Sequence, residues 1–161
     1  MSKVSLGYRN NNPLNIRFSP MNVWKGQTGC NKGFCVFDTK VFGYRAAFVL
    51  LHNYVKRGYD TVSEIISRWA PESENNTKNY IRVVVDHFNG YDDSGFKSLT
   101  ANTKLPKDDL EALLPYLFEL AWIMSLVECG FVHADFEREE VKKLWSAWFI
   151  AKEDYYYKLI K

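Results

Sequence analysis

Apolar residues recur at three- and four-residue spacing along most of the chain beyond residue 40, as they do in helices that bury one face. The segment VFGYRAAFVLLHNYVKRG shows this spacing clearly, through Phe42, Ala46, Val49, Leu50 and Tyr54. Gly58 follows the last of these positions, and glycine commonly ends helices. The pattern therefore predicts a long amphipathic helix over this segment.

Two shorter helices are predicted next, each with its own start signal. In DTVSEIISRWAP, Thr61 stands three residues before Glu64, which is the spacing of a capping box, and Pro71 ends the helix. In TKNYIRVVVDHF, Thr77 is the expected cap, and apolar residues again share one face. Both segments are thus expected to be amphipathic helices.

The most apolar stretch of the chain is LEALLPYLFELAWIMSLVECG, which contains Pro115. Proline breaks or kinks a helix, so the expected helix is PYLFELAWIMSLVE, apolar on nearly all sides and buried in the core. After it, DFEREEVKKLWSAWFIAKEDYY has the spacing of a last amphipathic helix.

The segment before residue 40 has a different character. Between Leu14 and Phe37 the chain is rich in turn residues and carries only short apolar pieces, which predicts a small hairpin. No repeat and no linker interrupts the 161 residues, a length that fits one domain. The predicted fold class is therefore mainly α (α+β), a single domain over residues 1–161 with a small β-hairpin near the N-terminus.

Composition and charge narrow the function classes. The net charge of +2 is too small to predict a nucleic-acid-binding protein. His52, His87 and His133 have no second ligand at metal-binding spacing, and no phosphate loop or cofactor motif is present, so neither metal nor cofactor is expected. The N-terminus lacks an apolar signal region and no run of about 18 apolar residues occurs, so synthesis in the cytoplasm without a membrane span is expected.

Three cysteines are present, and two of them flank the tetrapeptide NKGF. Cys30 and Cys35 could pair with each other or hold a metal. Free thiols are the expectation, because no second pair of ligands accompanies them.

Carboxylates, amides and aromatic residues remain, and these types suit a carbohydrate ligand. Glycosidic cleavage needs an acid that stays protonated in a poorly solvated site. Glu128 ends the most apolar segment, where burial and helix-end carbonyls would raise its pKa. Glu74 and Asp38 are the other catalytic candidates. A surface helix end is the alternative for Glu128, and capping or a turn for the other two.

Several motifs carry a family resemblance. The segments GYRNNNPLNIR, WKGQ, FCVFDTKVFGYRA and DTVSEIISRWAPESENNTKNYI resemble the phage and prophage proteins labelled structural protein P5-like. This resemblance covers about the first half of the chain well and implies a lysozyme-like fold that degrades peptidoglycan. The glycine usual after the motif's proline is Leu14 here, which argues against an obligatory left-handed backbone at that position.

The chain also has a distant likeness to glucosaminidases of the flagellar and autolysin type, because NPLNIR, WKGQ, FCVFDT and WAPESENNTKNY occur in the same order. Those enzymes place a glutamate helix in front of these segments, whereas here an apolar helix ending in Glu128 follows them. We hypothesise a circular permutation in which Glu128 lies within about 10 Å of Asn15 and Trp24, because one disaccharide must touch all three. The substrate-binding residues implied by the resemblance are Arg9, Asn11, Asn12, Asn15, Trp24, Gln27, Trp69, Asn75 and Tyr80.

Two interpretations of the asparagine-rich segment stay open. Its amides could form the floor of a sugar site, or they could bond only to backbone groups in a rigid turn. The two tryptophans, Trp24 and Trp69, could likewise line a groove or pack in the core.

The expected function is a phage-type glycosidase or lytic transglycosylase that cleaves bacterial peptidoglycan glycan strands. It would act at the cell wall after phage-type release, or on a virion with other virion proteins as partners. The alternative is a non-catalytic virion structural or wall-binding protein. In that case the aromatic tail WSAWFIAKEDYYY would form a partner surface.

Overall fold

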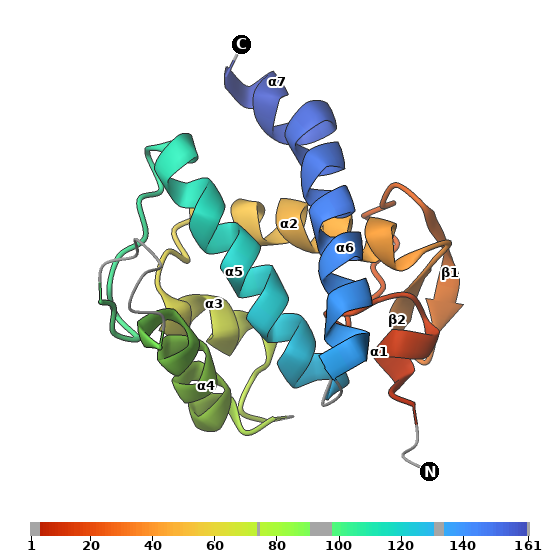
Figure 1. Ribbon diagram of the computed structural model, residues 1–161, viewed down its shortest axis with the longest axis horizontal. Coiled ribbons are helices and arrows are strands. Elements are labelled where there is room, and N and C mark those ends of the chain that lie inside the picture. Colours follow the sequence, from red (N-terminus) through yellow and green to blue (C-terminus); the bar gives the residue numbers. More distant parts are fainter. Residues whose placement is uncertain (1–3, 74, 91–97, 131–133, 161) are drawn as a thin grey trace. The chain divides into compact units, whose positions relative to one another are not determined.

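The computed structural model describes residues 4–73, 75–90, 98–130 and 134–160. These residues form a mainly helical structure with a small antiparallel hairpin near the N-terminus, which confirms the predicted fold class (Figure 1). The elements in chain order are α1 (Leu6–Arg9), β1 (Gln27–Asn31), β2 (Phe34–Phe37), α2 (Lys40–Lys56), α3 (Val62–Trp69), α4 (Thr77–Asn89), α5 (Leu110–Cys129), α6 (Ala134–Ala151), a π-helical turn (Lys152–Tyr156) and α7 (Tyr157–Ile160).

The chain divides into two compact units. The first unit comprises Met1–Leu50 and Met124–Lys161, and the second comprises Leu51–Ile123. Both boundaries fall inside helices, one in α2 and one in α5. The single domain over residues 1–161 stays a prediction.

In the first unit, β1 and β2 form the predicted hairpin. Cys30 lies opposite Cys35, and Asn31 lies opposite Phe34 across a two-residue turn. Alternate residues of β2 are buried, among them Phe37, which is the alternation expected of a strand with one face on the core.

Helices α2 and α6 contribute apolar contacts to the first unit. Phe48 of α2 meets Trp148 of α6 edge to face, with ring centroids 5.0 Å apart. Tyr156, which is fully buried in the π-helical turn, donates its hydroxyl to the carbonyl oxygen of Phe48 at 2.9 Å. The C-terminal segment is therefore part of this core.

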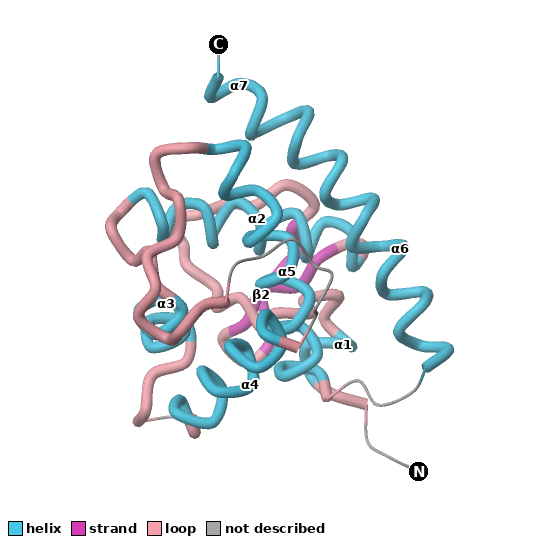
Figure 2. The backbone as a smooth tube through the Cα atoms, turned by 60° about the vertical axis from the view of Figure 1, so that its left-hand side comes forward, coloured by secondary structure: helices cyan, strands magenta, loops and turns pink. Residues whose placement is uncertain are grey.

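In the second unit, α3 and α4 pack against each other (Figure 2). The predicted capping box is present, because Thr61 Oγ1 accepts from the Glu64 N–H and the Glu64 carboxylate accepts from the Thr61 N–H. The predicted cap of α4 is wrong: Asn76 caps the helix, and its side chain accepts from Asn79 N–H. Thr77 is instead buried as the first helical residue, and its hydroxyl donates to the Ala70 carbonyl oxygen at 2.5 Å.

Helix α5 begins earlier than its proline predicts. It is continuous from Leu110 and passes through Pro115, so the expectation that Pro115 would begin the helix is wrong. Pro115 lies in the second turn and is exposed, and the bond that its missing N–H would make is to Glu111, which is also exposed and can be hydrated. Within the described part of the chain, α5 is long and apolar enough to cross a membrane by length and composition, a test that core helices also pass.

Candidate functional site

The asparagine loop, residues 10–15, is held by a dense set of local hydrogen bonds in the first unit. Ser5 caps the start of α1, which ends at Arg9 after a single turn with Asn10 as its C-cap. The chain then reverses, with Asn12 N–H donating to the Gly7 carbonyl oxygen at 2.8 Å. Asn11 and Asn15 have positive φ, at 53° and 52°, a conformation that asparagine tolerates better than most residues. Leu14 is not among the positive-φ residues and is fully buried, in line with the expectation for that position.

The amide of Asn12 is fully buried, and its hydrogen bonds within the described residues are to backbone groups. Its Nδ2 donates to the carbonyl oxygens of Ile16, at 2.9 Å, and Cys35, at 3.0 Å. Its Oδ1 accepts from the Ile16 N–H at 2.8 Å. This side chain joins the loop to β2. For Asn12 the structure therefore agrees with the interpretation in which the amides bond to backbone groups in a rigid turn.

Asn11 joins the loop to the start of α2. Its Nδ2 donates to the carbonyl oxygens of Phe37 and Asp38, at 3.0 and 3.1 Å. Its Oδ1 accepts from the ammonium group of Lys40 at 3.2 Å. Like Asn12, Asn11 uses its side chain to hold the backbone of a neighbouring segment.

Asn15 behaves differently, because its side chain meets a carboxylate. Asn15 Nδ2 donates to Glu128 Oε2 at 2.8 Å, across 113 positions of sequence. Glu128 is half-buried near the C-terminal end of α5. The next residue, Cys129, donates its thiol to the Pro13 carbonyl oxygen at 3.3 Å, so two consecutive helical residues contact the loop.

Two glycines make room for the loop. A Cβ on Gly7 would lie 2.5 Å from Asn15 Oδ1, and a Cβ on Gly43 would lie 2.2 Å from the Asn11 carbonyl oxygen. Both distances are shorter than any real Cβ contact, so a larger residue at either position would displace the loop. The glycines of GYRNNN and VFGYRA therefore allow α1 and α2 to approach the asparagine loop closely.

A buried charged cluster beside the loop was missed by the sequence analysis. Glu140 of α6 is fully buried; its Oε2 accepts from the Tyr44 hydroxyl at 2.9 Å and its Oε1 from Lys143 Nζ at 3.1 Å. Lys40 is nearly buried, and its ammonium group also lies 3.5 Å from the centroid of the Tyr8 ring. Lys40 and Tyr44 lie one helical turn apart on α2, but nothing local in the sequence marked them as buried.

Burial and charge shift the pKa values of this cluster. Desolvation lowers the pKa of Lys40, although the charge of Glu140 opposes the shift. Desolvation and the nearby Glu140 carboxylate both raise the pKa of Tyr44. Burial raises the pKa of Cys129 to about 11, with the charges of Glu128 and Glu140 adding to the effect. At neutral pH the Cys129 thiol is therefore protonated and donates to the loop.

The other predicted residues of the first unit lie on or near the hairpin. The Gln27 side chain accepts from the Trp24 N–H at 3.1 Å, so it closes the WKGQ turn, and Trp24 is half-buried. Asp38 is exposed after β2, and its N–H donates to the Gly26 carbonyl oxygen at 2.8 Å. Arg9 is exposed at the end of α1.

The remaining predicted residues belong to the second unit. Trp69 is half-buried and meets Tyr54 edge to face, with centroids 5.8 Å apart. Tyr80 is buried, and Asn75 is exposed with its amide 3.5 Å from the Pro71 carbonyl oxygen. Glu74 lies outside the described residues.

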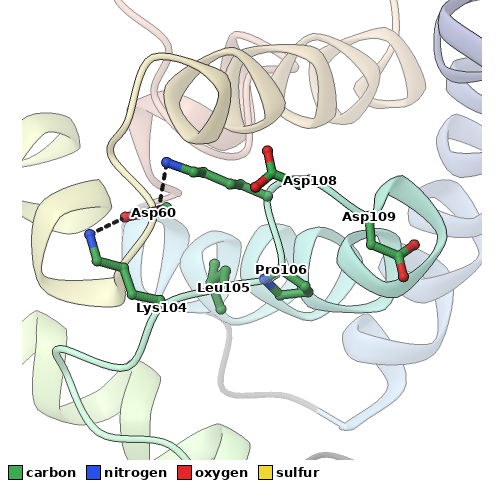
Figure 3. Close-up of a pocket in the computed structure, with 7 residues that line it drawn as sticks. Asp60, Lys104, Leu105, Pro106, Asp108 and Asp109 are labelled. Carbon is green, nitrogen blue, oxygen red and sulfur yellow. Dashed lines mark hydrogen bonds and ion pairs between the residues drawn. The ribbon is translucent and has the colours of Figure 1, made fainter.

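The second unit also contains a pocket of about 460 Å³ (Figure 3). At one side of it the buried carboxylate of Asp60 pairs with the ammonium groups of Lys104, at 2.9 Å, and Lys107, at 3.6 Å. The hydrogen bond from Lys104 is the main reason that the pKa of Asp60 is lowered. Of the predicted site residues that the structure describes, none lines this pocket.

The described residues hold no group of three side chains suited to a metal ion. His87 is not alone, however, because its Nε2 lies 2.8 Å from Glu119 Oε2. His52 is buried in α2, and His133 lies outside the described residues.

The fold and this site define a small, mainly helical protein in which a half-buried carboxylate contacts a rigid amide-rich loop. No family model matches the chain. Over 91 residues the chain is 41% identical to "Protein P5" of Pseudoalteromonas phage PM2. This match covers 53% of the present chain and 57% of that protein. The chain thus spans little more than half the length of this relative, and the identity shows homology to a phage protein over about half of the chain.

Proposed function

We propose that this protein cleaves the glycan strand of peptidoglycan, as a glycosidase or lytic transglycosylase with a lysozyme-like fold. The observation that carries the proposal is the 2.8 Å contact between Glu128 Oε2 and Asn15 Nδ2. It joins the carboxyl group best suited to be the acid with the loop whose residues carry the resemblance to P5-like phage proteins. Homology to a phage protein over about half of the chain agrees with the phage relationship that this resemblance implies.

Glu128 acts as the general acid in this proposal and gives its proton to the glycosidic oxygen as the bond breaks. An amide N–H can bond to a carboxyl oxygen whether the group is protonated or ionised. Asn15 would therefore hold the carboxyl group in one orientation before and after proton transfer. The ties of Asn11 and Asn12 to neighbouring backbone groups would keep the loop rigid during the reaction.

The second step of the reaction depends on a second group. Glu140 is fully buried with its two oxygens bound by Tyr44 and Lys143, so it is unsuited to activate water at a substrate. Asp38 is exposed and stays a candidate for that role, as does Glu74. Without such a carboxylate at about 6.5–9.5 Å from the acid, intramolecular attack by a sugar hydroxyl is favoured over direct attack by water. A lytic transglycosylase would use that route.

The proposal is tested on purified peptidoglycan sacculi with wild-type protein, Glu128→Gln and the matched control Glu139→Gln. Glu139 is a glutamate whose side chain is 64% exposed on α6, so its substitution changes charge without touching the loop. We expect the control to release muropeptides at the wild-type rate and Glu128→Gln to lose at least about 100-fold. Mass spectrometry of the fragments distinguishes anhydro ends, left by a transglycosylase, from reducing ends, left by a hydrolase.

A non-catalytic virion or wall-binding protein is the second candidate, and exposed aromatic residues of the tail favour it. Trp145 and Phe149 are 46% and 60% exposed on α6, whereas Trp148 and Tyr156 of the same tail are buried. This candidate predicts that wild type and Glu128→Gln both pellet with sacculi and that neither releases fragments. That result, across several wall types, would contradict the enzymatic proposal.

A further inference from the structure

The hairpin places two of the three cysteines directly opposite each other. Cys30 of β1 is paired with Cys35 of β2 in the antiparallel register, and both are free thiols. Directly opposite residues of a hairpin project from the same face. Backbone pairing therefore holds the Cβ atoms of the two cysteines near each other.

The position of the pair within the ladder suits a disulfide. Asn31 and Phe34 flank the two-residue turn and form the hydrogen-bonded closing pair, so Cys30 and Cys35 form the next, non-hydrogen-bonded pair. Consistent with this, the Cys35 N–H donates away from β1, to the Ile16 carbonyl oxygen at 2.9 Å. Cα atoms in such pairs are about 4.5 Å apart, at the short end of the range that a disulfide spans.

The two thiols differ in access. Cys30 is exposed, whereas Cys35 is fully buried and donates its thiol to the Arg17 carbonyl oxygen at 3.6 Å. Burial, with a contribution from the charge of Cys30, raises the pKa of Cys35 to about 11. An external oxidant would therefore meet Cys30 first, and Cys35 would react only with a partner already beside it.

We propose that Cys30 and Cys35 form a reversible cross-strand disulfide when the protein meets a low-molecular-weight disulfide such as oxidised glutathione. The Cys30 thiolate attacks one glutathione sulfur, which forms a mixed disulfide and releases one glutathione thiolate. Cys35 Sγ then attacks Cys30 Sγ and its proton passes to the departing glutathione sulfur, which forms the protein disulfide and releases the second glutathione as a thiol. Two protein thiols are oxidised and one glutathione disulfide is reduced to two thiols.

The disulfide would fasten the hairpin where the asparagine loop docks. The carbonyl oxygen of Cys35 accepts from Asn12 Nδ2, and its N–H donates to Ile16, so β2 is already tied to the loop at this residue. A link to Cys30 adds β1 to the same assembly. The inference concerns this covalent link and does not depend on the proposed enzymatic activity.

The test treats the folded, reduced protein with oxidised glutathione, then denatures it and alkylates the remaining thiols. We expect the number of alkylated thiols in wild type to fall from three to one, with no glutathione adduct left on the protein. Peptide mass spectrometry should then show Cys30 linked to Cys35. Cys129→Ser is the matched control and should form the same link. Cys35→Ser should stop at a glutathione adduct on Cys30.

Other outcomes would overturn the proposal. These are full alkylation of all three thiols, a lasting glutathione adduct on wild-type Cys30, or a link that includes Cys129. A second readout follows hydrogen exchange of the hairpin amides, which should slow about tenfold in oxidised wild type and recover on reduction. Unchanged exchange in a protein that carries the link would contradict the proposed fastening of the hairpin.

Discussion

The asparagine side chains at positions 11, 12 and 15 of the loop act in two ways. Asn11 and Asn12 replace backbone partners, because each bonds to carbonyl groups of a neighbouring segment. Asn15 instead directs its amide to the Glu128 carboxylate. Only an amide supplies both donors and an acceptor in so small a side chain, which explains why asparagine occupies the positions at 11 and 12.

Asn12→Asp is expected to destabilise the protein strongly. It would replace a buried amide donor with a carboxylate oxygen facing the carbonyl oxygens of Ile16 and Cys35. The Cys35 carbonyl oxygen would lose this donor, and Ile16 would keep only the bond from the Cys35 N–H. The expected loss in the free energy of unfolding is about 2–4 kcal/mol, measured by urea denaturation at neutral pH. Asn22→Asp, at an exposed loop position, is the control and should change stability by less than about 0.5 kcal/mol. Equal effects of the two changes would contradict this account of the loop.

At the scale of elements, helix starts follow local chemistry unless tertiary contacts use the residue otherwise. Thr61 caps α3 as its spacing predicts, while Thr77 is drawn into the core and leaves the cap of α4 to Asn76. Within α2, tertiary packing likewise places a histidine on the buried face of the helix. His52 is 5% exposed, and Lys56 lies one helical turn further on.

His52 should make stability depend on pH. Burial, with a smaller effect of the Lys56 charge, lowers the pKa of His52 from 6.5 to about 4. Below pH 6.5 the unfolded chain binds a proton that the folded chain does not, so stability falls as the pH falls from 6.5 toward 4 and is unaffected by this group above that range. The slope from this one group is at most about 1.4 kcal/mol per pH unit.

The measurement is urea denaturation of wild type and His52→Gln at a series of pH values. Other groups titrate in both proteins, so the informative quantity is the difference between the two free energies of unfolding. We expect the free energy of unfolding of wild type, minus that of His52→Gln, to decrease as the pH falls from 6.5 toward 4. A difference that stays constant with pH would show that His52 is protonated equally in both states.

At the scale of the whole molecule, the first unit is built from both ends of the sequence. Tyr156 is fully buried and bonds to the Phe48 carbonyl oxygen, and Asp154 pairs with Lys25 and Arg45. The arginine and lysine lower the pKa of Asp154 against the opposing effect of burial. The C-terminal segment is therefore a structural part of the unit that carries the candidate site.

Removal of residues 152–161 should destabilise the first unit severely. The truncated chain would lose the buried Tyr156 ring and both ion pairs of Asp154, an expected cost of more than about 3 kcal/mol. Removal of residues 158–161 alone is the control, since Lys158 and Leu159 are exposed. Thermal unfolding followed by circular dichroism distinguishes the two truncations. Similar melting temperatures for both would show that Tyr156 contributes little.

The sequence by itself determined helices α2 to α6, the hairpin and the mainly helical class, because periodicity, capping and turn chemistry act over a few residues. It also singled out Asn15 and Glu128, and the distant likeness to glucosaminidases led to the hypothesis that the two lie within about 10 Å of each other. The sequence did not give the start of α5, because the helix continues through Pro115, whose missing N–H leaves only the carbonyl group of the exposed Glu111 without its helical partner.

Only the tertiary structure decided which groups meet. The contact between Asn15 and Glu128 joins residues 113 positions apart, and the burial of Glu140 and Lys40 depends on packing between α2, α6 and the loop. Whether an amide bonds to backbone or to a carboxylate depends on the atom that folding places beside it. For that physical reason the sequence left both interpretations of the asparagine loop open. The structure assigns the side-chain N–H groups of Asn11 and Asn12 to backbone carbonyl groups and that of Asn15 to Glu128.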